Sequence, residues 1–215
     1  MDPRTSGDVS SHYILPNAMA VHSINDNGNT PSRRVDTVRQ SQRETSTLLS
    51  FRVPPQADNK TCTASIFAGH LGNGDRVGGG KTVDIFSTNI IDINKTPSGN
   101  MRNMQLARLS FNPNSKRFDF VSDMPSSIRQ FQVRAGDLLQ WEIVAVGTED
   151  EVSIEQDFNQ EGSGLPDGMF IDTPKDGAMK PQDIINRPGY ALPVINQICG
   201  VSGVPGTSIG VLYED

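Results

Sequence analysis

Cysteine, tryptophan and histidine are scarce in this sequence of 215 residues, which contains two Cys, one Trp and three His. Two cysteines are too few for a disulfide-dense scaffold or for a four-cysteine zinc site. The histidines, at positions 12, 22 and 70, show no recognisable metal-ligand spacing. We therefore expect neither a cofactor nor a metal site.

Long apolar runs and an excess of positive charge are also missing. No run approaches the roughly 18 apolar residues that a transmembrane helix needs, so membrane insertion is not expected. The formal net charge is −6, from 19 Lys and Arg against 25 Asp and Glu. With this balance, nucleic acid is not expected as a partner of the whole chain.

The aromatic residues divide the chain into three parts. All nine Phe and the single Trp lie between Phe51 and Phe170, and the three Tyr lie outside. Because aromatic rings dominate the energy of burial, we expect the folded domain at residues 48–172. Residues 1–47 are predicted to form a flexible, disordered arm. Residues 173–215 contain five Pro and are predicted to wrap the core as an irregular tail, with a last strand near 208–213.

A secretion signal is not predicted in this sequence. Ala18-Met19-Ala20 is similar to a signal-peptidase site, but Asp2 and Asp8 precede it and no apolar stretch does. The compartment stays open, because a secreted protein whose signal had been removed would have the same sequence.

Alternation of apolar and polar residues with a period of two indicates strands in five stretches. They are residues 62–68, 82–85, 118–120, 139–145 and 152–158. Gly, Pro, Asn and Asp lie between them, and no convincing long helix is present. The pattern predicts an all-β fold, an antiparallel β-sandwich.

The last two stretches predict a hairpin with its turn at Thr148-Glu149. Pairing 139–145 with 152–158 makes the apolar faces coincide. It also sets Glu142 opposite Glu155, and like charges in that position are unfavourable. Either both carboxylates are solvated, which is the favoured interpretation, or they share a cation or a proton. The acidic turn Glu149-Asp150-Glu151 is expected to be solvated.

Cys62 and Cys199 are a candidate disulfide that would tie the tail to the first core strand. Closing so long a loop is worth roughly 4–5 kcal/mol in the chain-entropy model, and it requires an oxidising compartment. Two buried thiols are an equally good interpretation of the same residues.

A family resemblance is carried by short motifs along the predicted domain. The stretch 131–136 (FQVRAG) is similar to a Phe-x-Cys-Pro-Ala-Gly motif, 153–159 to a final strand and turn, and 166–171 to a Pro-x-Gly-aromatic-Ile ending, while 60–63 and 83–87 fit early strands. Together these motifs resemble the fungal "But-two" (ubiquitin-binding-protein) C-terminal domain family.

That resemblance implies a compact β-sandwich of a kind common in filamentous fungi and often secreted, without catalytic residues that could be transferred. The position of the family's cysteine holds Val133, so Cys62 lacks the partner that the family implies. The residues after Ile171 have no counterpart. Some fungal proteins of similar appearance belong to natural-product pathways in which cofactor-free cyclases occur.

Three function classes follow from these observations. The leading one is a binding module that recognises a hydrophobic small molecule or a partner protein through its loops. The alternative is a cofactor-free cyclase, a pericyclase of Diels–Alder type, which works by holding a reactive molecule in position. A hydrolase built on Glu142 and Glu155 comes below both.

A remoter alternative is a viral coat-like protein, since a basic arm ahead of a β-sandwich neutralises RNA phosphates in such proteins. Four arginines gather in the predicted arm, but Asp36 and Glu44 dilute their charge.

No catalytic residue is assigned from the sequence. Trp141 is expected first as a core residue and second as part of a pocket. The candidate ligand-binding residues are Trp141, Met101, Met104, Arg108, Glu142 and Glu155.

Overall fold

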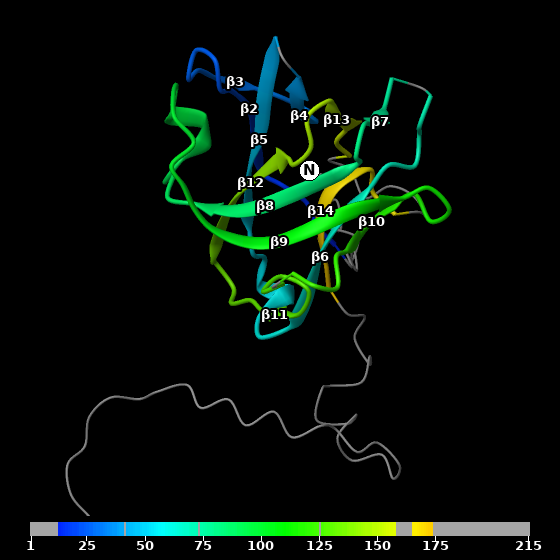
Figure 1. Cartoon of the computed structure of the whole chain (residues 1–215). Coiled ribbons are helices and arrows are strands. Elements are labelled where there is room, and N and C mark those ends of the chain that lie inside the picture. Colours follow the sequence, from blue (N-terminus) through cyan, green and yellow to red (C-terminus); the bar gives the residue numbers. More distant parts are fainter. Residues whose placement is uncertain (1–12, 41, 73, 125, 158–164, 174–215) are drawn as a thin grey trace, which may run out of the picture. The chain divides into compact units, whose positions relative to one another are not determined.

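The computed structural model describes residues 13–40, 42–72, 74–124, 126–157 and 165–173 (Figure 1). Within these ranges the chain forms strands and two short 3-10 helices. The strands are β1 (Tyr13–Ile14), β2 (Ala18–Ser23), β3 (Asn29–Pro31), β4 (Arg34–Gln40), β5 (Arg43–Arg52), β6 (Thr61–Phe67), β7 (Arg76–Gly78), β8 (Thr82–Thr88), β9 (Arg102–Asn112), β10 (Arg117–Phe120), β11 (Phe131–Gln132), β12 (Leu138–Ala145), β13 (Asp150–Glu155) and β14 (Gly168–Asp172); the helices are η1 (Pro55–Ala57) and η2 (Ile93–Lys95). The all-β fold predicted from the alternation is confirmed.

The strands form one antiparallel hydrogen-bonded path that folds back on itself. Its order is β1-β14-β6-β10-β9-β8-β12-β5-β4-β13-β7; in addition β2 pairs with β5, β3 pairs with β2, and β11 pairs with β6. At one corner β10 reaches β6 through the single pair Arg117–Phe67. At the other, β4 pairs with β5 only near their shared turn and then continues alongside β13. The path therefore makes the two layers of a β-sandwich.

The core lies between the two layers. Strands β5, β8, β9 and β12 contribute buried residues to the same cluster as β4, β6, β13 and β14. Trp141 belongs to it, with its ring 5.1 Å from the ring of Phe51 and 5.9 Å from that of Phe131. Leu139, Trp141 and Ile143 of β12 point into this cluster, as the alternation predicts.

The predicted boundary of the arm is wrong for residues 13–47. This stretch holds β1, β2, β3, β4 and the first half of β5, and its side chains are built into the sandwich. Ala18, Ala20 and Thr47 are buried there. These side chains are small and carry no rings, so the distribution of aromatic residues does not reveal them.

The predicted hairpin between 139–145 and 152–158 is also wrong. Strand β12 lies between β5 and β8, whereas β13 lies between β4 and β7. Glu142 stands opposite Leu48 and Phe86, and Glu155 stands opposite Arg34, so the two carboxylates share neither a cation nor a proton. The apolar faces coincide in either arrangement, so the alternation alone does not show which strand lies next to which.

Asp150 ties the turn between β12 and β13 to the loop before β8. Its carboxylate accepts hydrogen bonds from the backbone N–H groups of Gly147 (2.7 Å), Lys81 (3.2 Å) and Gly80. It is fully buried, so the expectation of a solvated acidic turn is wrong at this position. A Cβ on Gly79 would meet the Glu149 carbonyl, which accounts for glycine in the adjoining loop.

Cys62 is a buried thiol on β6, and burial raises its pKa to about 11. Cys199 and the last strand predicted near 208–213 lie outside the described residues, and so does nearly all of the predicted tail. The pairing of the two cysteines stays a prediction.

Candidate functional site

The outer face of β12 is covered by the segment 88–101, which includes η2. A second apolar cluster forms there, separate from the main core, from residues of β2, β5 and the covering segment: Ala18, Ala20, Leu48, Ile90 and Ile93. From Gln140 to Ile143, β12 is therefore buried on both faces, and its outward-facing Gln140 and Glu142 lie under this cover.

Glu142 is fully buried, and both of its carboxylate oxygens accept hydrogen bonds. One carboxylate oxygen, Oε2, accepts from Arg102 Nε at 2.8 Å, and the other, Oε1, accepts from Arg102 Nη2 at 2.9 Å. Ser46 Oγ (2.5 Å) and Asn100 Nδ2 (3.0 Å) also donate to Oε1. The ion pair with Glu142 raises the pKa of Arg102, whose guanidinium also lies over the ring of Phe86.

Three sets of hydrogen bonds hold the covering segment to the sheet. Asn29 Nδ2 donates to the carbonyls of Thr96 (3.0 Å) and Gly99 (2.8 Å). Asn100 donates to Glu142, as described above. Gln140 Nε2 donates to the carbonyl of Ile91 at 2.8 Å. The segment is thus fixed on both sides of η2, at Ile91 before it and at Thr96, Gly99 and Asn100 after it.

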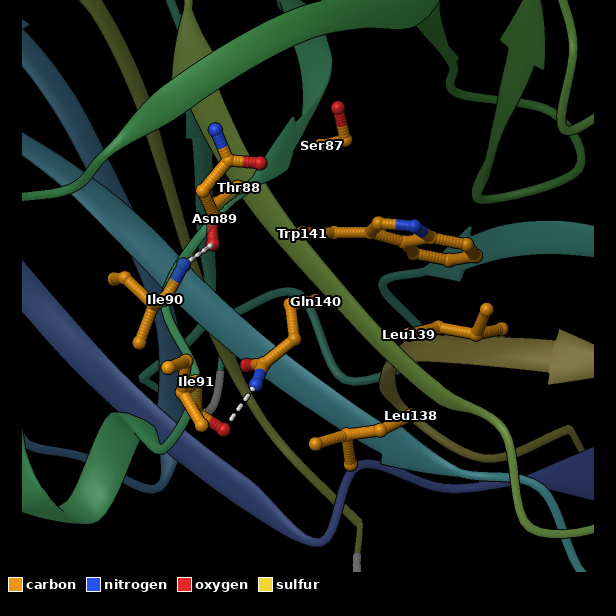
Figure 2. Close-up of a pocket in the computed structure, with 9 residues that line it drawn as sticks. All are labelled: Ser87, Thr88, Asn89, Ile90, Ile91, Leu138, Leu139, Gln140 and Trp141. Carbon is orange, nitrogen blue, oxygen red and sulfur yellow. Dashed lines mark hydrogen bonds between the residues drawn. The ribbon is translucent and has the colours of Figure 1, made fainter.

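A pocket lies where β8 and β12 separate. Their ladder ends at the pair Trp141–Ser87, beyond which residues 138–140 of β12 pair with β5 alone. The chain after Ser87 turns away toward η2, and the space left has a volume of about 450 Å³. Figure 2 shows the residues that line it: Ser87, Thr88, Asn89, Ile90, Ile91, Leu138, Leu139, Gln140 and Trp141.

The lining is apolar with a few hydrogen-bonding groups. Ile90, Ile91, Leu138, Leu139 and Trp141 supply the apolar part, and the remaining four side chains are neutral and polar. None of these nine side chains is acidic or basic. The described lining can therefore offer apolar contact and hydrogen bonds, and it provides no general acid or base.

Two large exposed apolar side chains line this pocket, and two more belong to residues whose backbone is bonded to its lining. Ile91 and Leu138 line it, and Ile91 is 87% exposed. Met104 is joined to it because its backbone N–H and carbonyl both bond to Ser87 Oγ. The backbone carbonyl of Met101 accepts a hydrogen bond from the N–H of Asn89. We call these four residues (Ile91, Met101, Met104, Leu138) the apolar rim. Among the described residues the fifth large exposed apolar side chain is Leu71, in the loop before β7.

The residues predicted from the sequence are brought together only in part. Trp141 lines the pocket and also belongs to the core, and Met101 and Met104 are in the rim. Arg108 is instead held by Asp84, with contacts of 2.7 and 2.8 Å. Glu155 lies on β13 with its side chain 73% exposed, 3.8 Å from Arg34.

Sequence reasoning missed Gln140, Ile91 and Leu138. Gln140 occupies a polar position of an alternating strand, where exposure is the ordinary expectation, and only the covering segment buries it. A signal was available at Asn89-Ile90-Ile91, because two adjacent isoleucines directly after a strand cannot both face its core.

An exposed histidine and a buried carboxylate form a separate polar group. His70 Nδ1 bonds to Asp167, which also accepts from the N–H of Gly69 at 2.6 Å. The backbone N–H of Asp167 donates to Asp157 at 2.9 Å. The contact with Asp167 raises the pKa of His70.

Within the described ranges, no three His, Cys, Asp or Glu side chains gather so that they could hold a metal ion. No helix in the same ranges has the length and apolar character to cross a membrane. Comparison of the chain with protein-family models, with curated proteins and with solved structures finds no match.

Proposed function

We propose that this protein is a binding β-sandwich whose pocket between β8 and β12 takes a small hydrophobic molecule. One observation carries the proposal: two of the five large apolar side chains exposed in the described residues, Ile91 and Leu138, line this pocket, and Met101 and Met104 are bonded through their backbone to other lining residues. Large apolar side chains that stay exposed at a pocket favour a binding site, because leaving them in water forgoes the free energy of burial.

The dimensions of the pocket favour a small molecule. A volume of about 450 Å³ falls within the range of roughly 300–1,000 Å³ that is typical of small-molecule sites. Its walls combine apolar side chains with a few neutral polar groups, which is the usual composition of such sites. The hydrogen bonds of Asn29, Asn100 and Gln140 hold one wall in place, so little ordering has to accompany binding.

The proposal is tested with a neutral apolar dye, Nile red, and with a library of apolar compounds. We expect the dye to bind the native protein with increased emission, and bound compounds to raise the melting temperature and change the fluorescence of Trp141. Ile91→Gln with Met104→Gln should weaken dye binding several-fold. Leu71→Gln is the matched control, because it changes an exposed apolar residue outside the pocket and the rim.

Equal dye binding by the rim variant and the Leu71 control would overturn the proposed site. If apolar compounds do not bind and a protein is captured through the rim instead, the ligand class is wrong. Product analysis of each bound compound tests the cyclase alternative, because a cyclase converts its ligand and a binding module returns it unchanged.

Membership of the "But-two" family remains a proposal. It is supported by the pairing of Phe131 with Cys62 in β11 and β6, with Val133 N–H bonded to the Lys60 carbonyl at 3.2 Å. In this register Val133 and Cys62 lie on the same face of neighbouring strands. A cysteine at position 133 would thus be near Cys62, as the family resemblance implies.

A further inference from the structure

We propose that Met101 and Met104, the two methionines of the apolar rim, are a peroxide-sensitive modification site whose oxidation lowers the affinity of the pocket. The proposal rests on the proposed function and adds a means of regulating the same site. Its basis is the unequal exposure of the methionines. Met101 is 57% exposed and Met104 is 62% exposed, whereas Met19 and Met169 are buried at 4% and 0%.

The exposure of Met101 follows from its two neighbours in the chain. Asn100 and Arg102 both donate hydrogen bonds to the buried Glu142. Between them Met101 has a φ of 46°, a left-handed conformation that residues other than glycine seldom adopt. The side chains of both neighbours are thus directed to Glu142, whereas that of Met101 stays in solvent.

Met104 lies at an irregularity in the pairing of β8 with β9. Ser87 of β8 faces two residues of β9, Asn103 and Met104, where the register of the two strands shifts. Such a bulge changes the direction of side chains relative to the regular alternation. Ser87 Oγ accepts from the N–H of Met104 at 3.2 Å and donates to its carbonyl at 3.3 Å, which fixes the backbone at this point.

Both methionines are therefore immediate neighbours of residues that line the pocket. Met104 is bonded to Ser87, and the carbonyl of Met101 accepts from the N–H of Asn89 at 3.0 Å. Their side chains are half of the four that form the apolar rim. Oxidising them changes the apolar surface beside the pocket and leaves the core as it is.

The reaction transfers one oxygen atom from hydrogen peroxide to the thioether sulfur. The O–O bond of the peroxide breaks and an S–O bond forms, so the sulfur is oxidised to a sulfoxide and the peroxide is reduced to water. A sulfoxide is polar, and an oxidised side chain offers a ligand less apolar contact. Methionine sulfoxide reductases return the sulfoxide to the thioether, which makes the change reversible.

The buried thiol of Cys62 does not compete for the oxidant. Cys62 is 1% exposed, and burial raises its pKa to about 11, so very little of the reactive thiolate is present near neutral pH. Cys199 lies outside the described residues. The test therefore includes a thiol reductant, which reverses disulfides and sulfenic acids and leaves sulfoxides in place.

The test treats the full chain with increasing doses of hydrogen peroxide, removes the oxidant and adds the thiol reductant. Peptide mapping by mass spectrometry follows each methionine, and titration with Nile red measures affinity. We expect Met101 and Met104 to be oxidised at doses that leave Met19 and Met169 intact. Nile red should then bind roughly 3–10-fold more weakly, the effect of removing about one methylene group from apolar contact. The melting temperature should change little, because both side chains are exposed.

Variants then assign the loss of affinity to these two residues. Met101→Leu with Met104→Leu keeps apolar side chains that cannot form a sulfoxide, so its affinity for Nile red should not respond to peroxide. Met124→Leu is the matched control, because it removes a methionine outside the rim and should leave the response unchanged. Methionine sulfoxide reductases A and B should restore binding by the oxidised, unmodified chain.

The outcomes separate this proposal from the proposed function. If Met19 and Met169 are oxidised as fast as Met101 and Met104 in the folded protein, the modification site is wrong. If both rim methionines are oxidised and Nile red binds as before, the regulation is wrong and the apolar site stands. If the double leucine variant also loses affinity, another residue is responsible and the proposal is wrong. If the untreated protein does not bind Nile red, the proposed function fails and its regulation fails with it.

Discussion

The two faces of β12 are both buried, but in different ways. The inner face packs Trp141 and Ile143 into an apolar core shared by both layers. On the outer face Gln140 and Glu142 lie beneath the covering segment, and most of their polar atoms have a hydrogen-bond partner. The inner face is stabilised by the area it removes from water, whereas the outer face depends on specific partners.

This difference explains where the candidate site lies. A close-packed apolar core leaves little room for a ligand. On the outer face, the covering segment 88–101 does not fill the space where β8 and β12 separate. This space is the pocket. The pocket therefore has the core residue Trp141 in one wall and Gln140 of the outer face in another.

The largest effect is expected on the inner face. Trp141→Ala should lower the free energy of unfolding by about 3–5 kcal/mol, because it removes a large buried ring that packs on Phe51 and Phe131. Chemical denaturation followed by circular dichroism measures this loss. Trp141→Phe should cost clearly less, and equal losses for the two variants would show that the ring is not packed as described.

The next effect is expected at the outer-face ion pair. Arg102→Met should cost about 2–3 kcal/mol, since it leaves the Glu142 carboxylate buried without its charged partner, while the partial exposure of Arg102 moderates the loss. The double variant Arg102→Met with Glu142→Leu should recover most of this stability. A double variant that loses the sum of the single losses would mean that the two side chains do not act as a pair.

Gln140→Leu should change the free energy of unfolding by no more than about 1 kcal/mol. It loses the bond to the Ile91 carbonyl, but it also removes an unpaired buried oxygen, and the two effects oppose each other. Denaturation curves of this variant and of Glu155→Gln, the exposed control, should nearly coincide. A loss comparable to that of Trp141→Ala would mean that Oε1 has a partner of its own.

The smallest effect is expected at the exposed His70–Asp167 pair, which contrasts with the buried ion pair. The folded-state pKa of His70 is raised, so its stabilising contribution is complete below the unfolded value of about 6.5 and is lost as the pH rises through the folded value. His70→Gln should therefore lower the melting temperature slightly at about pH 5.5 and leave it unchanged at about pH 9. The opposite pH dependence would contradict the pairing.

The sequence predicted the strands better than it predicted their neighbours. The stretches 62–68, 82–85 and 139–145 are strands or parts of strands with their apolar residues buried. The sequence predicts an arm at residues 13–47 because they contain no Phe or Trp, and it pairs β12 with β13 because both alternate. Of the candidate residues, Trp141 lines the pocket, and the sequence does not indicate Gln140 and Ile91, which also line it.

What the sequence determined by itself is local: which stretches are strands, which of their residues point one way, and that the fold is all-β. A period of two depends only on neighbouring residues, so it can be recognised without the rest of the chain. The tertiary structure decided the partners of β12, the buried state of Glu142 and Asp150, and the pocket. Each of these depends on contacts between residues far apart in the sequence, such as Glu142 with Arg102 and Asp150 with Gly80. Alternation is a local pattern and does not predict which distant residues meet.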